Sequence, residues 1–236
     1  HRDLSYQHFI PSRPIAINVL VCLDNFTKEF PHDHLYLLIM VNWIHEISWA
    51  KYQQNEGNEN AESTDSTGLT AFGADGFTVG ADTNYADTTG DGMVAWNWKA
   101  NGAGSANTNG NMAETVTVSA NTDAGFSIVR YTGDGAIATV GHGLDEAPEV
   151  IMVKNIDTTD AWRVYHSSNT AAPETDWLIL NASNPTADHV DEWNDTAPTS
   201  SVFTIGTAEE TNTDDEDYIV YCFHSVDGYS KMGSYV

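Results

Sequence analysis

The stretch FTIGTAEETNTDDEDYIVYCFH, residues 203–224, repeats the pattern of FTVGADTNYADTTGDGMVAWNWK, residues 77–99, at an offset of 126 positions without a gap. In both copies a short apolar run, an acidic stretch and a second apolar run follow one another. The matched pairs are Phe77 with Phe203, Gly80 with Gly206, Asp91 with Asp217 and Val94 with Val220. The repeat predicts a strand–acidic loop–strand device that the chain uses twice.

A second pair of segments extends this duplication. LIMVNWIHEISWAKYQQ at 38–54 resembles VIMVKNIDTTDAWRVYHSS at 150–168, with Trp49 opposite Trp162. Residues 100–110 are rich in Gly, Asn and Ala, which is typical of a linker, whereas ETVTVSA at 114–120 alternates like a strand. The predicted organisation is a first β unit over 1–100, a linker plus strand over 101–124, a second β unit over 125–227 and a terminal strand over 228–236.

Apolar residues recur with a period of two rather than 3.6. EVIMVKN, AWRVYHS, DWLILNA, SVFTIG and DYIVYCFH are short, rich in β-branched and aromatic residues, and bounded by Gly, Pro, Asn and Asp. Many short strands with regular turn signals indicate a sandwich or barrel. The predicted fold is all-β, with two homologous β-sandwich or jelly-roll-like units in tandem and an unpaired C-terminal strand.

The last nine residues, GYSKMGSYV at 228–236, resemble GFSIVRYTGDG at 125–135, the opening strand of the second unit. The chain thus begins a third copy. Such a strand either folds back on its own domain or adds to the sheet of a neighbouring subunit. The second arrangement does not close on itself and generates filaments. The candidate assembly residues are Tyr229, Met232, Tyr235 and Val236, with residues 1–14 as the partner segment.

The net charge is −25, with nine Lys and Arg residues. Nucleic-acid binding needs a basic surface, so the composition excludes that class of partner. The longest apolar run, residues 35–44, is too short to span a membrane and contains Asn42. No signal-peptide pattern opens the sequence. Three glycosylation sequons begin at Asn25, Asn181 and Asn194.

The two acidic loops of the repeat are either solvated connections or calcium sites, because Ca²⁺ prefers carboxylate and carbonyl oxygens. Their spacing does not follow the EF-hand pattern. The candidate calcium ligands are Asp87, Asp91, Asp214, Asp215 and Asp217. No other cofactor is expected.

Cys22 and Cys222 both lie in apolar runs. They are either two buried thiols or a disulfide that closes a long loop. His142 in VGHGL and His166 in VYHSS, near strand ends, read as structural histidines.

The motifs DGFTVG, AGFSIVRYTGDG, VIMVKN, WRVYH, SSVFTIG, YIVYCF and VDGYSKMGSY together resemble a repeated β domain. This domain occurs in uncharacterised bacteriophage virion structural and tail-appendage proteins. The resemblance covers about residues 50–236, whereas residues 1–49 match poorly. It implies a structural role and supplies no catalytic residues.

The sequence therefore predicts a non-enzymatic structural subunit of an extracellular filament or virion appendage. Head-to-tail assembly through β-strand pairing would make it a homo-polymer. A carbohydrate-binding adhesion module that recognises cell-surface glycans is the alternative, because the chain contains seven Trp residues. A glycan-degrading enzyme would need a carboxylate pair, and the sequence singles out none.

Overall fold

The computed structural model describes residues 38–41, 51–52, 60–64, 66–72, 76–82, 95–180 and 182–234. Strands dominate this part of the chain, and its helices are single turns. The all-β prediction is therefore confirmed. None of the helices in these residues is long and apolar enough to cross a membrane.

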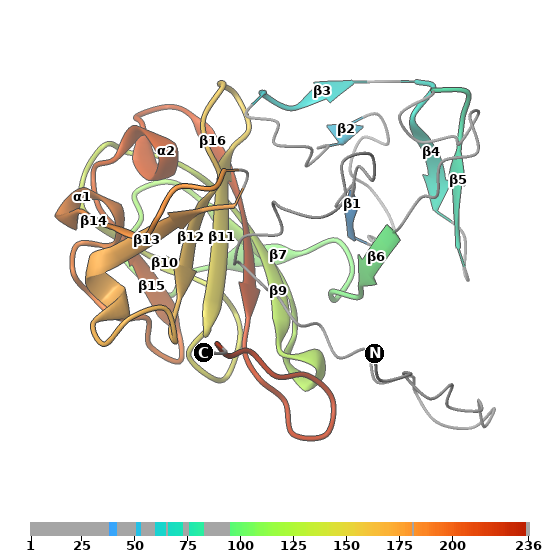
Figure 1. Cartoon of the computed structure of the whole chain (residues 1–236). Helices are drawn as coiled ribbons and strands as arrows, with labels where there is room; N and C mark the ends of the chain where they lie inside the picture. Colours follow the sequence, from blue (N-terminus) through green and yellow to red (C-terminus); the bar gives the residue numbers. More distant parts are fainter. Residues whose placement is uncertain are drawn as a thin grey trace.

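An eight-stranded antiparallel sheet forms the centre of the structure (Figure 1). Its order across the sheet is β14-β13-β12-β11-β16-β9-β8-β7. The strands are β7 (Ser105–Asn107), β8 (Val116–Asn121), β9 (Phe126–Thr132), β11 (Val150–Asn155), β12 (Arg163–His166), β13 (Asp176–Ile179), β14 (Ala187–Asp188) and β16 (Asp217–Phe223). β16 lies between β9 and β11, so the last strand of the sheet in sequence is a central one.

A smaller layer covers one face of this sheet. It contains the antiparallel pair β10 (Ala138–Gly141) and β15 (Val202–Ile205), with the short helices α1 (Val190–Trp193) and α2 (Glu209–Asn212) beside it. Two 3₁₀ turns, η1 (Thr122–Ala124) and η2 (Pro173–Thr175), complete the described elements after residue 100. The two layers give this part of the chain a β-sandwich-like architecture.

The period of two in the sequence explains how the sheet is buried. Along β16, Tyr218, Val220 and Cys222 face the β10–β15 layer, and Ile219, Tyr221 and Phe223 face the opposite side. Side chains on both faces are buried, which is unusual for an antiparallel sheet. Val220 and Cys222, which alternate along this strand, and His224 just after it are all buried.

The second face carries its own apolar cluster. Phe126, Val150, Trp162 and Phe223 belong to it, together with Ala100 and Met232 from segments outside the sheet. Trp98 packs against Phe223 edge to face, with ring centroids 5.8 Å apart. The chain segment before β7 and the segment after β16 therefore both cover this second face of the sheet.

The earlier part of the chain contains shorter strands. The pairs are β1 (Leu38–Val41) with β6 (Ala95–Trp98), β2 (Lys51–Tyr52) with β3 (Ser63–Thr64), and β4 (Leu69–Phe72) with β5 (Phe77–Val79). Within the residues described before position 100, each sheet has two strands. The described residues thus show one sandwich-like unit.

A glycine marks the same position in both copies of the repeat. Gly206 donates its N–H to the carbonyl of Glu192, and Ala208 donates to that of Asp191. Gly80 and Asp82 make the same two bonds, to Gly68 and Thr67. A Cβ on either glycine would lie 2.1 Å or 2.3 Å from a backbone oxygen, so both positions require glycine. The two copies share this local backbone arrangement.

The segment expected to be a linker plus strand, 101–124, belongs to the large sheet. β8 is the expected strand, but β7 occupies the Gly- and Asn-rich half as well. Asn111 explains why this polar run is ordered, because its Oδ1 accepts hydrogen bonds from the N–H and the hydroxyl of Thr139. The asparagine side chain joins the run to β10, and β7 within the run pairs with β8.

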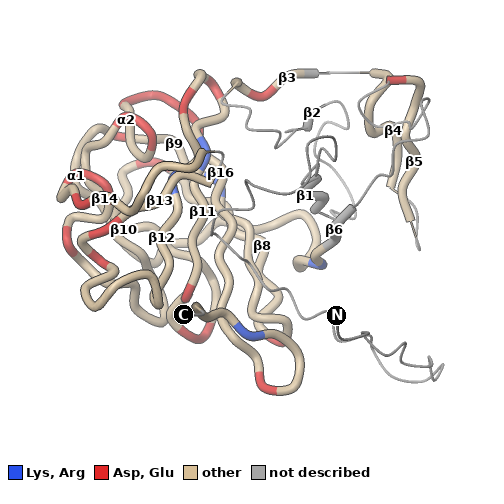
Figure 2. The backbone as a smooth tube through the Cα atoms, viewed as in Figure 1, with Lys and Arg blue, Asp and Glu red and all other residues tan. Residues whose placement is uncertain are grey.

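Acidic residues are frequent in the loops around α1 and α2 (Figure 2). Two of the cations in the described residues after position 95 are buried, Lys154 at 1% exposed and Arg163 at 6%. These cations hold the interior together, so the surface is even more acidic than the composition indicates.

Candidate functional site

The segment 226–234 leaves the end of β16 and turns back toward its own sheet (Figure 1). Val226 and Ser230 form an isolated antiparallel bridge, with N–H to O distances of 3.0 and 2.9 Å. Gly228 stands at the turn with φ of +74°. Residues 228–234 therefore form a hairpin-like turn and its continuation, and the strand expected over 228–236 is absent from these described residues.

Met232 fixes this segment to the second face of the sheet. Its side chain is 7% exposed and belongs to the same apolar cluster as Phe126 and Val150. Its N–H donates to Oγ of Ser225 over 2.9 Å, and the N–H of Ser225 donates to the Glu149 carboxylate. We call residues 226–234, which make these contacts with the sheet, the docked segment.

His166, at the end of β12, lies beneath the docked segment. Its Nδ1 accepts a hydrogen bond from the N–H of Ser168 over 3.0 Å, and the backbone of Gly233 hydrogen-bonds to the ring. Burial lowers the pKa of His166, while the Glu149 carboxylate and the Gly233 backbone oppose that change. The neutral ring therefore fits this place better than the charged one.

Two other histidines use Nδ1 in the same way. His142 accepts from the N–H of Leu144 over 3.1 Å, and its Nε2 lies 3.0 Å from the carbonyl of Thr199. His189 accepts from the N–H of Asp191 at the start of α1. Burial lowers the pKa of His142, and the nearby His224 lowers it further. Both rings are engaged in backbone hydrogen bonds, and the structural interpretation of His142 and His166 stays a prediction.

Three of the calcium candidates lie where the acidic loop enters β16, Asp214 and Asp215 in the loop and Asp217 as the first residue of the strand. Both carboxylate oxygens of Asp217 are engaged, by Arg130 at 2.9 Å and by the Thr132 hydroxyl at 2.7 Å. Asp214 and Asp215 are exposed, with Asp215 in the left-handed region at φ of +61°. In the part of the chain that the structure describes, no three His, Cys, Asp or Glu side chains are arranged to hold a metal ion.

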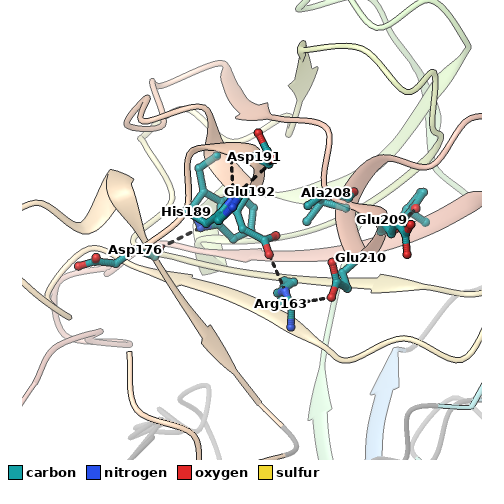
Figure 3. A network of polar contacts seen from close by, with 11 residues as sticks. Arg163, Asp176, His189, Asp191, Glu192, Ala208, Glu209 and Glu210 are labelled. Carbon is teal, nitrogen blue, oxygen red and sulfur yellow. Dashed lines mark hydrogen bonds and ion pairs between the residues drawn. The ribbon is translucent and has the colours of Figure 1, made fainter. Parts of the chain in front are cut away.

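A buried ion network joins β12 to both short helices (Figure 3). Nε of Arg163 donates to Glu192 of α1 over 2.7 Å, and Nη2 donates to Glu210 of α2. The guanidinium also stacks over the Trp177 ring at 4.1 Å from its centroid. One cation thus binds two carboxylates and an aromatic face, and it ties α1 and α2 to the sheet.

This network has an excess of negative charge. Burial raises the pKa of Glu192 to about 7, although the Arg163 guanidinium opposes the rise. Glu210 adds to it because a second carboxylate nearby disfavours the charged form. Nη1 of Arg163 and Oε2 of Glu192 are buried without a hydrogen-bond partner among the described residues. Glu192 is the group of this network that can exchange a proton, and the network holds α1 and α2 on the sheet.

The remaining predicted residues fall in different places. Asn194 caps the end of α1 at φ of +50°, in a partly exposed turn, and Tyr229 is 36% exposed. Cys222 is buried, and burial raises the pKa of its thiol to about 12. The residues Cys22, Asn25, Asp87, Asp91, Asn181, Tyr235 and Val236, and the segment 1–14, lie outside the described residues. The disulfide between the two cysteines therefore stays a prediction.

Sequence reasoning missed Arg163, Glu192 and Glu210 altogether. The only available signal was a lone Arg within the apolar strand AWRVYHS, since an isolated cation in a buried strand needs a carboxylate partner. Nothing in the local sequence indicated which acidic residues those partners are.

No curated protein and no solved structure matches the chain. A family model described as Domain of unknown function (DUF7483) matches residues 48–236, which include all strands from β2 to β16. The chain therefore belongs to the family Domain of unknown function (DUF7483).

Proposed function

We propose that this protein is a non-enzymatic structural subunit of an extracellular filament or virion appendage. The observation that carries the proposal is the attachment of residues 226–234. An apolar side chain, Met232, enters the sheet's second cluster at the end of a short segment that turns at Gly228. A segment held in this way is suited to exchange between copies of the chain.

Exchange needs no new binding surface. Each copy offers the place that Met232 occupies, so a neighbour's segment can fill it with the same contacts. The contact is heterologous, because a segment on one copy meets a sheet on the next. Repetition of such a contact gives a head-to-tail polymer. Tyr229 at the turn, and Tyr235 and Val236 beyond it, are the residues we assign to the contact between copies.

The internal repeat supports a modular building block. We propose that residues 1–100 and 125–227 are two homologous β-sandwich units, and that stacking within the chain resembles stacking between chains. The matched backbone hydrogen bonds at Gly80 and Gly206 support this duplication. Repeat architectures bury apolar faces between neighbouring units, which gives directional assembly.

The experiment compares the intact chain with a variant that lacks residues 228–236, by electron microscopy and light scattering. We expect filaments from the intact chain and monomers from the truncated one. Met232→Ala provides a milder variant, in which filaments should be shorter or need higher protein concentration. Two monomeric samples would overturn the proposal. Glycan arrays on the same monomers would then test the carbohydrate-binding alternative.

A further inference from the structure

Two exposed loops carry an asparagine that is followed by glycine. The pairs are Asn101–Gly102 and Asn109–Gly110, and the sequence contains no other pair of this kind. Cγ of an asparagine side chain lies within reach of the main-chain nitrogen of the next residue, so the two can react within the chain. Glycine leaves that nitrogen unhindered because it has no Cβ. The surroundings of each pair then decide whether the reaction takes place in the folded protein.

Asn101–Gly102 lies in the turn between β6 and β7, and one side chain holds both of its ends (Figure 1). Oγ of Ser119 accepts the N–H of Asn101 over 2.9 Å, and the same hydroxyl donates to the carbonyl of Gly102 over 2.8 Å. The peptide group that joins the two residues lies between these bonds and takes no part in them. Nothing lies within 4 Å of the place that a Cβ of Gly102 would occupy, so this peptide group has room to rotate.

Asn109–Gly110 is packed against β10 instead. Gly110 forms an isolated antiparallel bridge to that strand, and Asn111 donates its N–H to the carbonyl of Thr139 over 3.1 Å. A Cβ on Gly110 would lie 2.2 Å from the same carbonyl oxygen. The carbonyl oxygen of Asn109 lies 2.9 Å from the place of a Cβ on Gly141. The backbone of β10 therefore restricts the rotation of this second peptide group.

We propose that Asn101 is a site of spontaneous modification, which the folded chain converts to aspartate and isoaspartate, and that the fold protects Asn109 from the same reaction. The main-chain nitrogen of Gly102 loses its proton to solvent and forms a bond to Cγ of Asn101. The bond between Cγ and Nδ2 breaks, and Nδ2 leaves as ammonia after taking a proton from solvent. A cyclic imide remains.

Water then opens the imide at one of its two carbonyl carbons. Attack at Cγ gives aspartate and restores the original main chain. Attack at the main-chain carbonyl carbon of residue 101 gives isoaspartate, in which the chain reaches Gly102 through Cβ and Cγ. Either route consumes one water and releases one ammonia. The reaction needs no oxidant, cofactor or second copy of the chain.

The isoaspartate product alters a place where the chain is anchored on both sides. Ala100, directly before the site, is 4% exposed in the apolar cluster of the sheet's second face, and Ser119 is 1% exposed. One more main-chain carbon moves the carbonyl of Gly102 away from the N–H of residue 101, and Ser119 then loses one of its two partners. We expect amide hydrogen exchange at residue 101 to become about fivefold faster, as the loss of one hydrogen bond allows.

Incubation of the full-length chain at mildly alkaline pH, followed by peptide mapping with mass spectrometry, measures the reaction at each asparagine. We expect Asn101 to react in the folded chain at nearly the rate that it has in guanidinium chloride. Asn109 should react at least about tenfold more slowly in the folded chain than in the denaturant, because its loop must open first. The ammonia released should equal the asparagine converted.

Two matched variants assign the signal. Asn101→Gln should abolish most of the ammonia release from the folded chain, because the longer side chain forms its cyclic imide far more slowly. Asn109→Gln should keep the wild-type release. Slow reaction of both asparagines in the folded chain, equal rates at the two, or a faster reaction at Asn109 would overturn the proposal.

Asn101→Asp separates the added charge from the longer main chain. This variant carries the carboxylate but keeps both Ser119 bonds, so its amide exchange at residue 101 should equal that of the unmodified chain. The isoaspartate form, isolated after incubation, should show the faster exchange. Equal exchange in the isoaspartate form and in Asn101→Asp would contradict the loss of a Ser119 bond.

Discussion

Nε of Arg163 donates to Oε1 of Glu192 over 2.7 Å, and the two side chains are only 8% and 4% exposed. The bond joins β12 to α1 across the interior of the sandwich-like unit. Because both groups are shielded from water, removing either one leaves the other charge without compensation.

Replacement of Arg163 by Met should therefore be among the most damaging single changes. We expect a loss of about 3–5 kcal/mol in the free energy of unfolding, because two glutamates lose their cation. Glu192→Gln keeps the acceptor oxygen and removes the buried charge, so its loss should be about 1 kcal/mol. Urea unfolding of both variants measures the difference. Equal losses would contradict this account of the network.

Glu192 should also give the stability a distinct pH dependence. Its folded pKa, about 7, lies above the ordinary value of 4.5, so the folded protein binds this proton more tightly than the unfolded chain. The resulting stabilisation is present below pH 4.5 and is lost as the pH rises through about 7. The stability of wild type relative to Glu192→Gln should thus fall over that window, as followed by urea midpoints at several pH values.

His142 should act in the opposite direction. Burial lowers its folded pKa from 6.5, so the folded protein binds this proton more weakly than the unfolded chain. Its stabilisation is present above pH 6.5 and is lost as the pH falls through the folded pKa. In His142→Gln the acid side of the stability profile should be flatter than in wild type. An unchanged acid side would contradict the lowered pKa of His142 in the folded protein.

Gly206→Ala should test the backbone contact that the two repeats share. The added Cβ would lie 2.1 Å from the carbonyl oxygen of Asp191, which is backbone and cannot swing aside. We expect a loss of about 2 kcal/mol or more in the free energy of unfolding. Gly76→Ala is the matched control, since nothing lies within 4 Å of its Cβ, and its effect should stay within about 0.5 kcal/mol.

The sequence predicted the strands well and their arrangement poorly. Alternation in DYIVYCFH placed β16 and its two faces, because the period of side chains along a strand is fixed by backbone geometry. The same alternation carries no information about partners. The pairing of β16 with β9, for example, joins Asp217 to Thr132 across 85 positions. Nothing local to either strand specifies that choice.

The polar interior was harder still to foresee. Asn212 is 1% exposed, and its amide nitrogen donates to the carbonyls of Ala136 and Gly206. In the sequence it is the single Asn of an acidic stretch, with no mark that predicts its burial. Side chains that replace a backbone partner depend on the approach of distant segments. The docked segment depends on the same kind of approach, since Ser225, Glu149 and Met232 meet only after the sheet forms.

The position of β16 also dictates the order in which the protein can be completed during synthesis. The ribosome delivers β7, β8 and β9 first and β11 to β14 next, so two half-sheets emerge with facing open edges. Until β16 follows, the edge of β9 and the edge of β11 expose unpaired backbone groups and apolar side chains. A nascent chain at this stage is open to aggregation. We therefore expect the open edges of β9 and β11 to need chaperone protection most in the interval before β16 is synthesised.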